Sequence, residues 1–180
     1  FQQAANARLA WQIGAPLQVA GTANLAGELQ VIGQVSGYTH AARETVVQAG
    51  NGVTGTFGSL TRGPGVFLEG TLGYEANRAY LDITRLDVTA AALSMSAITA
   101  QSLGAAERVE GAFARIDGAS SAGGAPISGD FTRAAGAFQA IQSEAAALAA
   151  LDSMSGAQHA AALTATFDNV DMGRRAIASR

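Results

Sequence analysis

Glycine and alanine are distributed unevenly along the chain, and this imbalance constrains the fold more than any other feature of the sequence. Residues 1–87 contain 13 Gly and 13 Ala, whereas residues 88–180 contain 9 Gly and 28 Ala. Short segments separated by Gly favour strands and turns, and Ala-rich segments favour helices because Ala has the highest helix propensity. We therefore predict an α+β chain with two domains, β-structure in 1–87 and helices in 88–180.

Period-two alternation supports strands in the first part. Leu9 and Trp11 alternate with Arg8 and Gln12, and the segments 24–31, 66–75 and 80–84 alternate in the same way. The turn-forming residues 75–78 between the last two segments predict a β-hairpin. Frequent Gly and Pro residues make the strands short and closely spaced, which fits a solenoid, a sandwich or a barrel.

Helical periodicity predicts three helices in the second part. Apolar residues recur at three- and four-residue steps over 106–116, and a Gly- and Ser-rich link spans 118–129. We expect a second helix with Asp130 as its N-cap and an apolar stripe over 131–148. Ser155 and Gln158 have the spacing of a capping box, which predicts a third helix that extends to the region of Arg174 and Arg175.

Composition excludes several classes of function. The chain has no Cys and only two His, so disulfides, Cys-ligated zinc and multi-histidine metal sites are excluded. A net charge of −3 does not provide the basic surface that nucleic acid requires. We therefore expect no cofactor, no metal and no nucleic-acid partner. The uncharged run 88–106 is too rich in Ala and hydroxyl residues for a membrane-spanning helix.

No catalytic motif is convincing. Residues 50–55 match the dinucleotide-binding pattern G-x-G-x-x-G, but the following Thr56, Phe57 and Gly58 do not favour the helix that this motif needs. His40 and His159 have no G-x-S-x-G partner, so we interpret them as surface or partly packed residues. Glu107 and Glu110 lie one helical turn apart and are interpreted as a solvated charged face.

Two segments resemble a known family. Residues 53–60 and 65–85 are similar to the end of an autotransporter passenger, in which a Gly-Thr-Phe strand precedes a hairpin ending in Tyr-Leu-x-Ile-Thr-Arg. Residues 149–160, AALDSMSGAQHA, resemble the connector that precedes the membrane barrel in that family. The runs 14–19, 43–47 and 81–86 are most similar to autotransporters whose passengers carry a subtilisin-like protease. None of that protease's catalytic motifs occurs here, so no catalytic residue is predicted.

The resemblance implies a fold and a function. It favours a β-solenoid, consisting of right-handed β-helix end rungs with a hairpin cap, followed by an α-helical connector. It implies a non-catalytic module at the bacterial cell surface, joined to an upstream passenger, a serine protease in the most similar members, and to an outer-membrane barrel that is missing from this chain. The chain would then be a fragment of a longer precursor.

Two sets of residues would carry this function. The hairpin would act as a folding nucleus, and the third helix would present its arginines in the barrel pore. The nucleus residues are Val66, Leu68, Leu72, Tyr74, Tyr80, Leu81 and Ile83, and the pore residues are Arg174, Arg175 and Arg180. The alternative is a cell-surface binding module whose β face recognises glycan or protein while the helices mediate attachment. A carbohydrate-stacking platform could be formed by Trp11, Tyr38, Tyr74 and Tyr80, but these aromatic residues do not cluster in the sequence, so we expect them to pack in the core or at an end rung.

Overall fold

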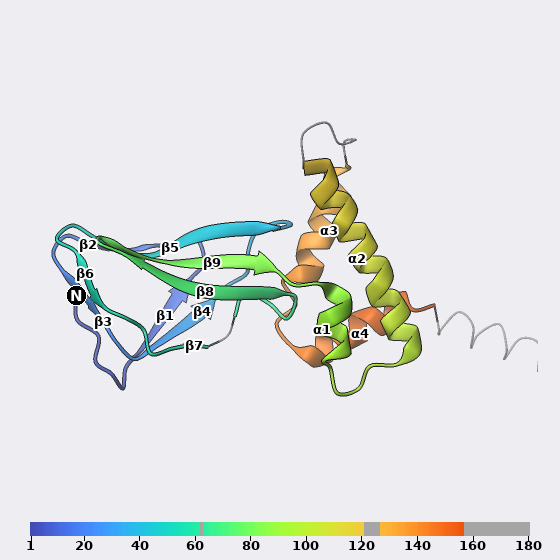
Figure 1. The fold of residues 1–180 in the computed structure, drawn as a ribbon, viewed down its shortest axis with the longest axis horizontal. Coiled ribbons are helices and arrows are strands. Elements are labelled where there is room, and N and C mark those ends of the chain that lie inside the picture. Colours follow the sequence, from blue (N-terminus) through green and yellow to red (C-terminus); the bar gives the residue numbers. More distant parts are fainter. Residues whose placement is uncertain (62, 121–126, 157–180) are drawn as a thin grey trace, which may run out of the picture.

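The chain folds into a β-rich part followed by a helical part. A computed structural model describes residues 1–61, 63–120 and 127–156. In Figure 1 the helices lie beyond one end of the strands, where β9 ends and β5 begins. The strands are β1 (Arg8–Gln12), β2 (Leu17–Val19), β3 (Ala23–Leu25), β4 (Glu28–Ile32), β5 (Ala41–Ala49), β6 (Val53–Gly55), β7 (Ser59–Thr61), β8 (Leu68–Glu75) and β9 (Arg78–Arg85). The helices are α1 (Val88–Leu93), α2 (Ala100–Ser120), α3 (Gly129–Gln139) and α4 (Glu144–Met154).

The described strands form three small sheets. Strands β1, β4 and β7 make a parallel sheet in that order, and β3 pairs with β6 in parallel. The four-stranded sheet has the order β2-β5-β9-β8, with β2 and β5 parallel and the remaining pairs antiparallel. The chain is therefore a mixed α+β protein.

The predicted β-solenoid is wrong. Among the described residues the sheets stay small and separate, none of them closes, and the long hairpin gives one of them an antiparallel half. The spacing of Gly and Pro residues in the sequence determines where short strands end. It does not determine which strands pair, because pairing depends on contacts between distant residues.

The glycine pattern of residues 50–55 has a structural explanation. Gly52 and Gly55 have φ angles of 102° and 69°, a region that L-residues with side chains rarely adopt. A Cβ at Gly55 would lie 2.2 Å from the carbonyl oxygen of Leu25 on the paired strand. Gly55 therefore allows the backbones of β3 and β6 to approach closely, and neither glycine opens a helix for a dinucleotide.

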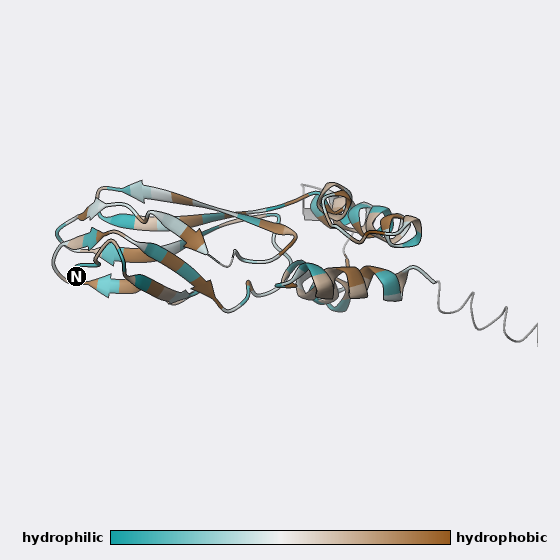
Figure 2. Ribbon diagram, turned by 90° about the horizontal axis from the view of Figure 1, so that it is seen from below, coloured by the Kyte–Doolittle hydropathy of each residue, from teal (hydrophilic) through white to brown (hydrophobic). Residues whose placement is uncertain are grey.

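The predicted hairpin is confirmed. β8 and β9 pair in continuous antiparallel register from Leu68 opposite Arg85 to Glu75 opposite Arg78. Leu68, Leu81 and Ile83 are buried in the core between the sheets, which also includes Trp11, Leu25, Leu29, Val46 and Val47. Figure 2 shows the alternation of apolar and polar residues along these strands.

A second apolar core lies among the helices and the loops that face them. Phe113 and Ile116 of α2 are buried there with Val88 and Ala92 of α1 and Leu151 of α4. The β-rich part contributes Phe67, which is fully buried and stacks on Phe138 with ring centroids 4.7 Å apart. The two parts of the chain are therefore joined through this core.

The predicted second helix is two helices. Ser128, and not Asp130, caps α3 by accepting the Phe131 N–H, and Ser143 caps α4 by accepting the Ala146 N–H. Between them the chain leaves the helical path, so that Ile141 O accepts the Val66 N–H at 2.8 Å. The apolar periodicity continued through this break because Ile141 packs against the same core.

The third predicted helix falls outside the described residues. Ser155 is not an N-cap: it has helical backbone angles and forms the C-cap of α4, where its N–H donates to Asp152 O. The pore candidates Arg174, Arg175 and Arg180, together with His159, also lie outside the described residues.

Candidate functional site: the junction of sheets and helices

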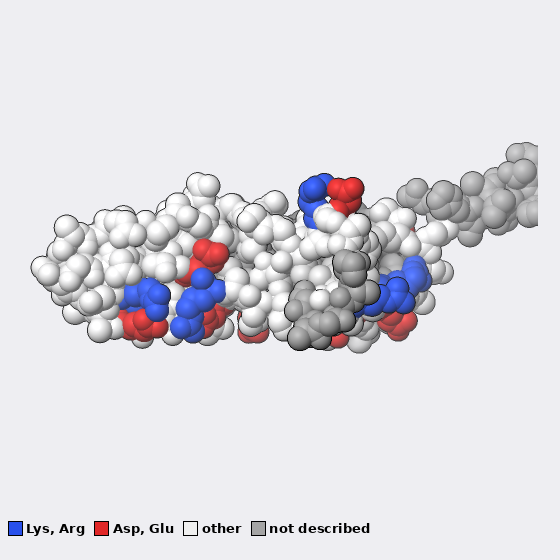
Figure 3. All heavy atoms as spheres, turned by 90° about the horizontal axis from the view of Figure 1, so that it is seen from above, with Lys and Arg blue, Asp and Glu red and all other residues white. Residues whose placement is uncertain are grey.

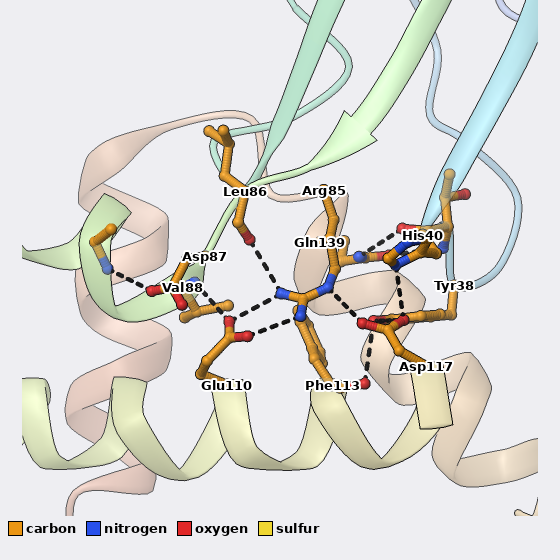
Figure 4. Close-up of polar contacts among 12 residues, drawn as sticks. Tyr38, His40, Arg85, Leu86, Asp87, Val88, Glu110, Phe113, Asp117 and Gln139 are labelled. Carbon is orange, nitrogen blue, oxygen red and sulfur yellow. Dashed lines mark hydrogen bonds and ion pairs between the residues drawn. The ribbon is translucent and has the colours of Figure 1, made fainter. Parts of the chain in front are cut away.

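A polar network fastens the end of the hairpin to α2. Arg85, the last residue of β9, donates through Nε to Asp117 Oδ2 at 2.8 Å and through Nη1 to Glu110 Oε2 at 2.9 Å. The Val88 N–H also donates to Glu110 at 2.8 Å, and the Tyr38 hydroxyl donates to Asp117 Oδ1 at 2.8 Å. Figure 4 shows how these side chains converge between β9, α1 and α2. We call Tyr38, His40, Arg85, Glu110 and Asp117 the junction network.

The charges of this network are largely shielded from water. The side chains of Arg85, Glu110 and Asp117 are 15%, 19% and 18% exposed. Hydrogen bonds from Arg85 to Glu110 raise the pKa of the guanidinium further, so Arg85 remains charged. Burial, and then the hydrogen bond to Asp117, raises the pKa of Tyr38, so its hydroxyl remains a donor. An ion pair with this degree of burial depends on both partners being present.

A second contact joins the loop before β5 to α3. The side-chain amide of the buried Gln139 accepts the Thr39 N–H and donates to Thr39 O, both at 2.9 Å. One turn earlier, Gly136 lies so close to the loop that a Cβ would be 2.3 Å from the carbonyl carbon of Gly37. The amide of Gln139 therefore pairs with the backbone as a neighbouring strand would.

Replacing Gln139 with Leu is expected to lower the free energy of unfolding by about 2 kcal/mol. The substitution leaves the Thr39 N–H and C=O without their partners, and Thr39 is buried. Urea denaturation measures the change. Gln101→Leu on the exposed side of α2 is the matched control and should change the free energy by about 0.5 kcal/mol or less. Equal effects of the two substitutions would contradict this assignment.

Six of the seven folding-nucleus candidates lie in two environments. Leu68, Leu72, Tyr74, Leu81 and Ile83 belong to the sheet core or pack against it. Val66 instead packs against the helical core, where its N–H donates to Ile141 O. The structure thus places most of the predicted nucleus in one core and one residue of it at the junction.

Tyr80 lies on the outer face of the four-stranded sheet. Its ring covers Gly73 of β8, since a Cβ there would be 2.2 Å from the ring. The Arg43 guanidinium lies 3.8 Å from the ring centroid and also forms two hydrogen bonds with Asp82, which lower the pKa of that carboxyl. In Figure 3 arginine and acidic side chains lie next to one another over the sheets. This surface is a compensated cluster of charges.

The aromatic residues weighed as a binding platform do not share a surface. Trp11 is buried and donates to Ala15 O, and Tyr74 accepts the Phe57 N–H. Tyr38 belongs to the junction network, and Tyr80 lies between Gly73 and Arg43. Trp11 and Tyr74 therefore belong with the sheet core, and Tyr38 and Tyr80 lie at two other places, so the four rings form no common platform.

The charged face predicted for α2 is only partly correct. Glu107 is exposed, but Glu110 is half-buried and pairs with Arg85. One sequence feature could have indicated this site. Phe113 and Asp117 follow Glu110 by three and seven residues, which places the three side chains on one face of a helix. Their partner on β9 is 25 residues away from Glu110 and had no local signature.

Groups that could support catalysis are also dispersed. His40 contacts Asp117, whereas the buried Ser102 hydroxyl lies between Thr99 and Asp152 at the contact of α2 and α4. Within the described ranges no cluster of metal-ligating side chains is found. A hollow of about 660 Å³ lies beside Gln34 and Gln142, and its described lining contains no ionisable side chain.

Comparison with known proteins gives no family assignment. No family model matches the chain, and neither a curated protein nor a solved structure is similar to it. Among the helices that the structure describes, none combines the length and the apolar character needed to cross a membrane.

Proposed function

We propose that this chain is a non-catalytic folding and secretion module of an autotransporter at the bacterial cell surface. It would link an upstream passenger, a serine protease in the most similar members, to an outer-membrane barrel of the same precursor. The similarity of residues 53–60, 65–85 and 149–160 to that family supports the proposal. The observation that carries it is the free edge formed by the first strands.

The first strands are edge strands in all three sheets. β1 and β2 each have a paired strand on one side in the described part of the chain, whereas β3 has β6 on one side and residues 1–3 on the other. Residues 1–3 already lie along β3, where Phe1 O accepts the Asn24 N–H and the Gln3 N–H donates to Asn24 O. An extended segment therefore fits this edge, and a free edge is a template for further strands.

The hydrogen-bonding groups of the free edge can be identified. Ala7 O accepts the Glu28 N–H, and the Ile13 N–H donates to Ile32 O. The backbone N–H and C=O groups of the odd-numbered residues of β1 therefore point toward β4. Because N–H groups alternate in direction along a strand, the Ala10 N–H faces away from β4. By the same reasoning, Val19 bonds to the β5 side and the Gln18 N–H faces outward.

Proline at both outward positions, Ala10→Pro with Gln18→Pro, tests the proposal. Proline removes a donor that the described ladders do not use, so the free energy of unfolding of the purified chain should change by about 1 kcal/mol or less. In cells expressing the full reading frame that encodes this chain, the upstream polypeptide should lose protease resistance and surface delivery should fall.

Ala10→Ser with Gln18→Ser keeps both N–H groups and is the matched control, which should export normally. The proposal fails if the proline variant delivers and protects the upstream polypeptide as the wild type does. It also fails if the full reading frame encodes no preceding polypeptide or no following barrel.

A further inference from the structure

The inward-facing apolar residues of β1 and β2 are only partly covered. Leu9 of β1 packs against the sheet core and is half-buried, whereas Leu29, its in-register neighbour on β4, is fully buried. Leu17 of β2 is likewise half-buried, and Val47 opposite it on β5 is fully buried. In the described part of the chain, β4 and β5 have a strand on both sides and β1 and β2 on one side only. The sheet core is therefore open along the free edge that β1 and β2 form.

A column of polar side chains crosses the outer face of the sheet formed by β1, β4 and β7. Arg8 of β1 is in register with Glu28 of β4 and donates through Nε to Glu28 Oε2 at 2.8 Å. Glu28 Oε1 accepts the Thr61 hydroxyl of β7. The hydrogen bonds from Thr61 and Arg8 lower the pKa of Glu28, so its carboxylate is ionised at neutral pH. Both oxygens of this carboxylate are therefore paired within the column.

The guanidinium of Arg8 is only partly used by this column. Among the described residues it bonds through Nε alone, and the side chain is 58% exposed. A guanidinium has further N–H donors, so the Nη groups of Arg8 can serve a second acceptor. A parallel strand added to β1 would place one residue beside Arg8 and the next beside Leu9. Because successive side chains alternate between the two faces, the first would lie on the outer face and the second on the core face.

We propose that the free edge of β1 recognises a strand of the upstream polypeptide that carries a carboxylate beside Arg8 and apolar side chains beside Leu9 and Trp11. This recognition rests on the proposed function, which supplies the upstream polypeptide, and it adds the chemistry that aligns the incoming strand. A carboxylate beside Arg8 continues the alternation of opposite charges across the sheet, whereas a basic residue there would face a like charge. A shift by one residue would place the carboxylate on the core face, so the charge specifies the register.

The spacing of the existing strands indicates where this carboxylate lies in the reading frame. Arg8 precedes its in-register neighbour Glu28 by 20 residues, and Glu28 precedes Ser59 by 31. We expect the residue beside Arg8 to precede it by a similar separation and to be Asp or Glu, with apolar residues one and three positions later. A reading frame without such a segment would contradict the proposal.

Exchanging the two charges of the column tests this recognition. Arg8→Glu with Glu28→Arg keeps an ion pair between β1 and β4 but presents a carboxylate to the incoming strand. The unfolding equilibrium constant of the purified chain should stay within about threefold of wild type, because an exposed pair contributes little. In the protein expressed from the full reading frame, chymotrypsin should cleave the upstream polypeptide about threefold to tenfold faster, because like charges then face each other. Replacing the upstream carboxylate with Arg in this variant should restore the wild-type rate.

Asp130→Arg with Arg133→Asp is the matched control, because it exchanges an exposed ion pair on α3 and should leave the cleavage rate unchanged. The proposal is wrong if the column exchange leaves the rate unchanged, or if Arg in the upstream strand does not restore it. If the rate then still rises in the Ala10→Pro, Gln18→Pro variant, the acidic partner is wrong and the proposed function stands. If neither variant changes the rate, both are wrong.

Discussion

Replacing Arg85 with Met is expected to lower the free energy of unfolding by about 3 kcal/mol. Methionine retains much of the side-chain volume but removes the guanidinium that bonds to Glu110 and Asp117. Both carboxylates are more than four-fifths shielded from water, so solvent compensates poorly for the lost partner. Urea denaturation monitored by circular dichroism measures the difference.

Arg133→Met is the matched control for this substitution. Arg133 pairs with Asp130 three residues away on α3, and both side chains are strongly exposed. Exposed pairs of this kind contribute little, so we expect a change of about 0.5 kcal/mol or less. If the two substitutions cost the same, Arg85 does not fasten the sheets to the helices.

Replacing Gly136 with Ala is expected to cost about 2 kcal/mol, although Ala favours helices. The added Cβ would lie 2.3–2.6 Å from backbone atoms of Gly37 and Tyr38. Backbone atoms cannot move aside as the end of a flexible side chain can. The helix must therefore move away from the loop, which also lengthens the two hydrogen bonds between Gln139 and Thr39.

Gly111→Ala on α2 is the matched control, and we expect it to stabilise the protein. A Cβ at Gly111 of α2 meets nothing within 4 Å, so the substitution should raise the free energy of unfolding by about 0.5 kcal/mol. Comparison of thermal unfolding for the two variants separates close packing from helix propensity. Stabilisation by both substitutions would show that α3 does not approach the loop closely.

Local patterns in the sequence predicted local structure well. Alternation over 66–84 identified the hairpin, and helical periodicity over 106–116 identified the centre of α2. These elements were predictable because most of the apolar side chains of each element face one core. The break between α3 and α4 was missed because Ile141 preserves the periodicity while its carbonyl bonds to Val66.

Associations between distant segments were not predictable in the same way. The solenoid was expected from short strands between glycines, but strand pairing depends on packing between residues that are far apart in sequence. The junction network was not predictable for the same reason. In the sequence Arg85 is a single cation at the end of a strand, and only the folded chain places Glu110 and Asp117 of α2 beside it. The residues of the junction network could therefore be read from the sequence, but the contacts between them could not be predicted.

The neighbouring residues Phe67 and Leu68 have a consequence for how strands are aligned. Both are buried, yet Phe67 belongs to the helical core and Leu68 to the sheet core. A shift of β8 by one residue would exchange their directions and remove the large ring that stacks on Phe138. The complete packing of the helices therefore requires the correct alignment of the hairpin.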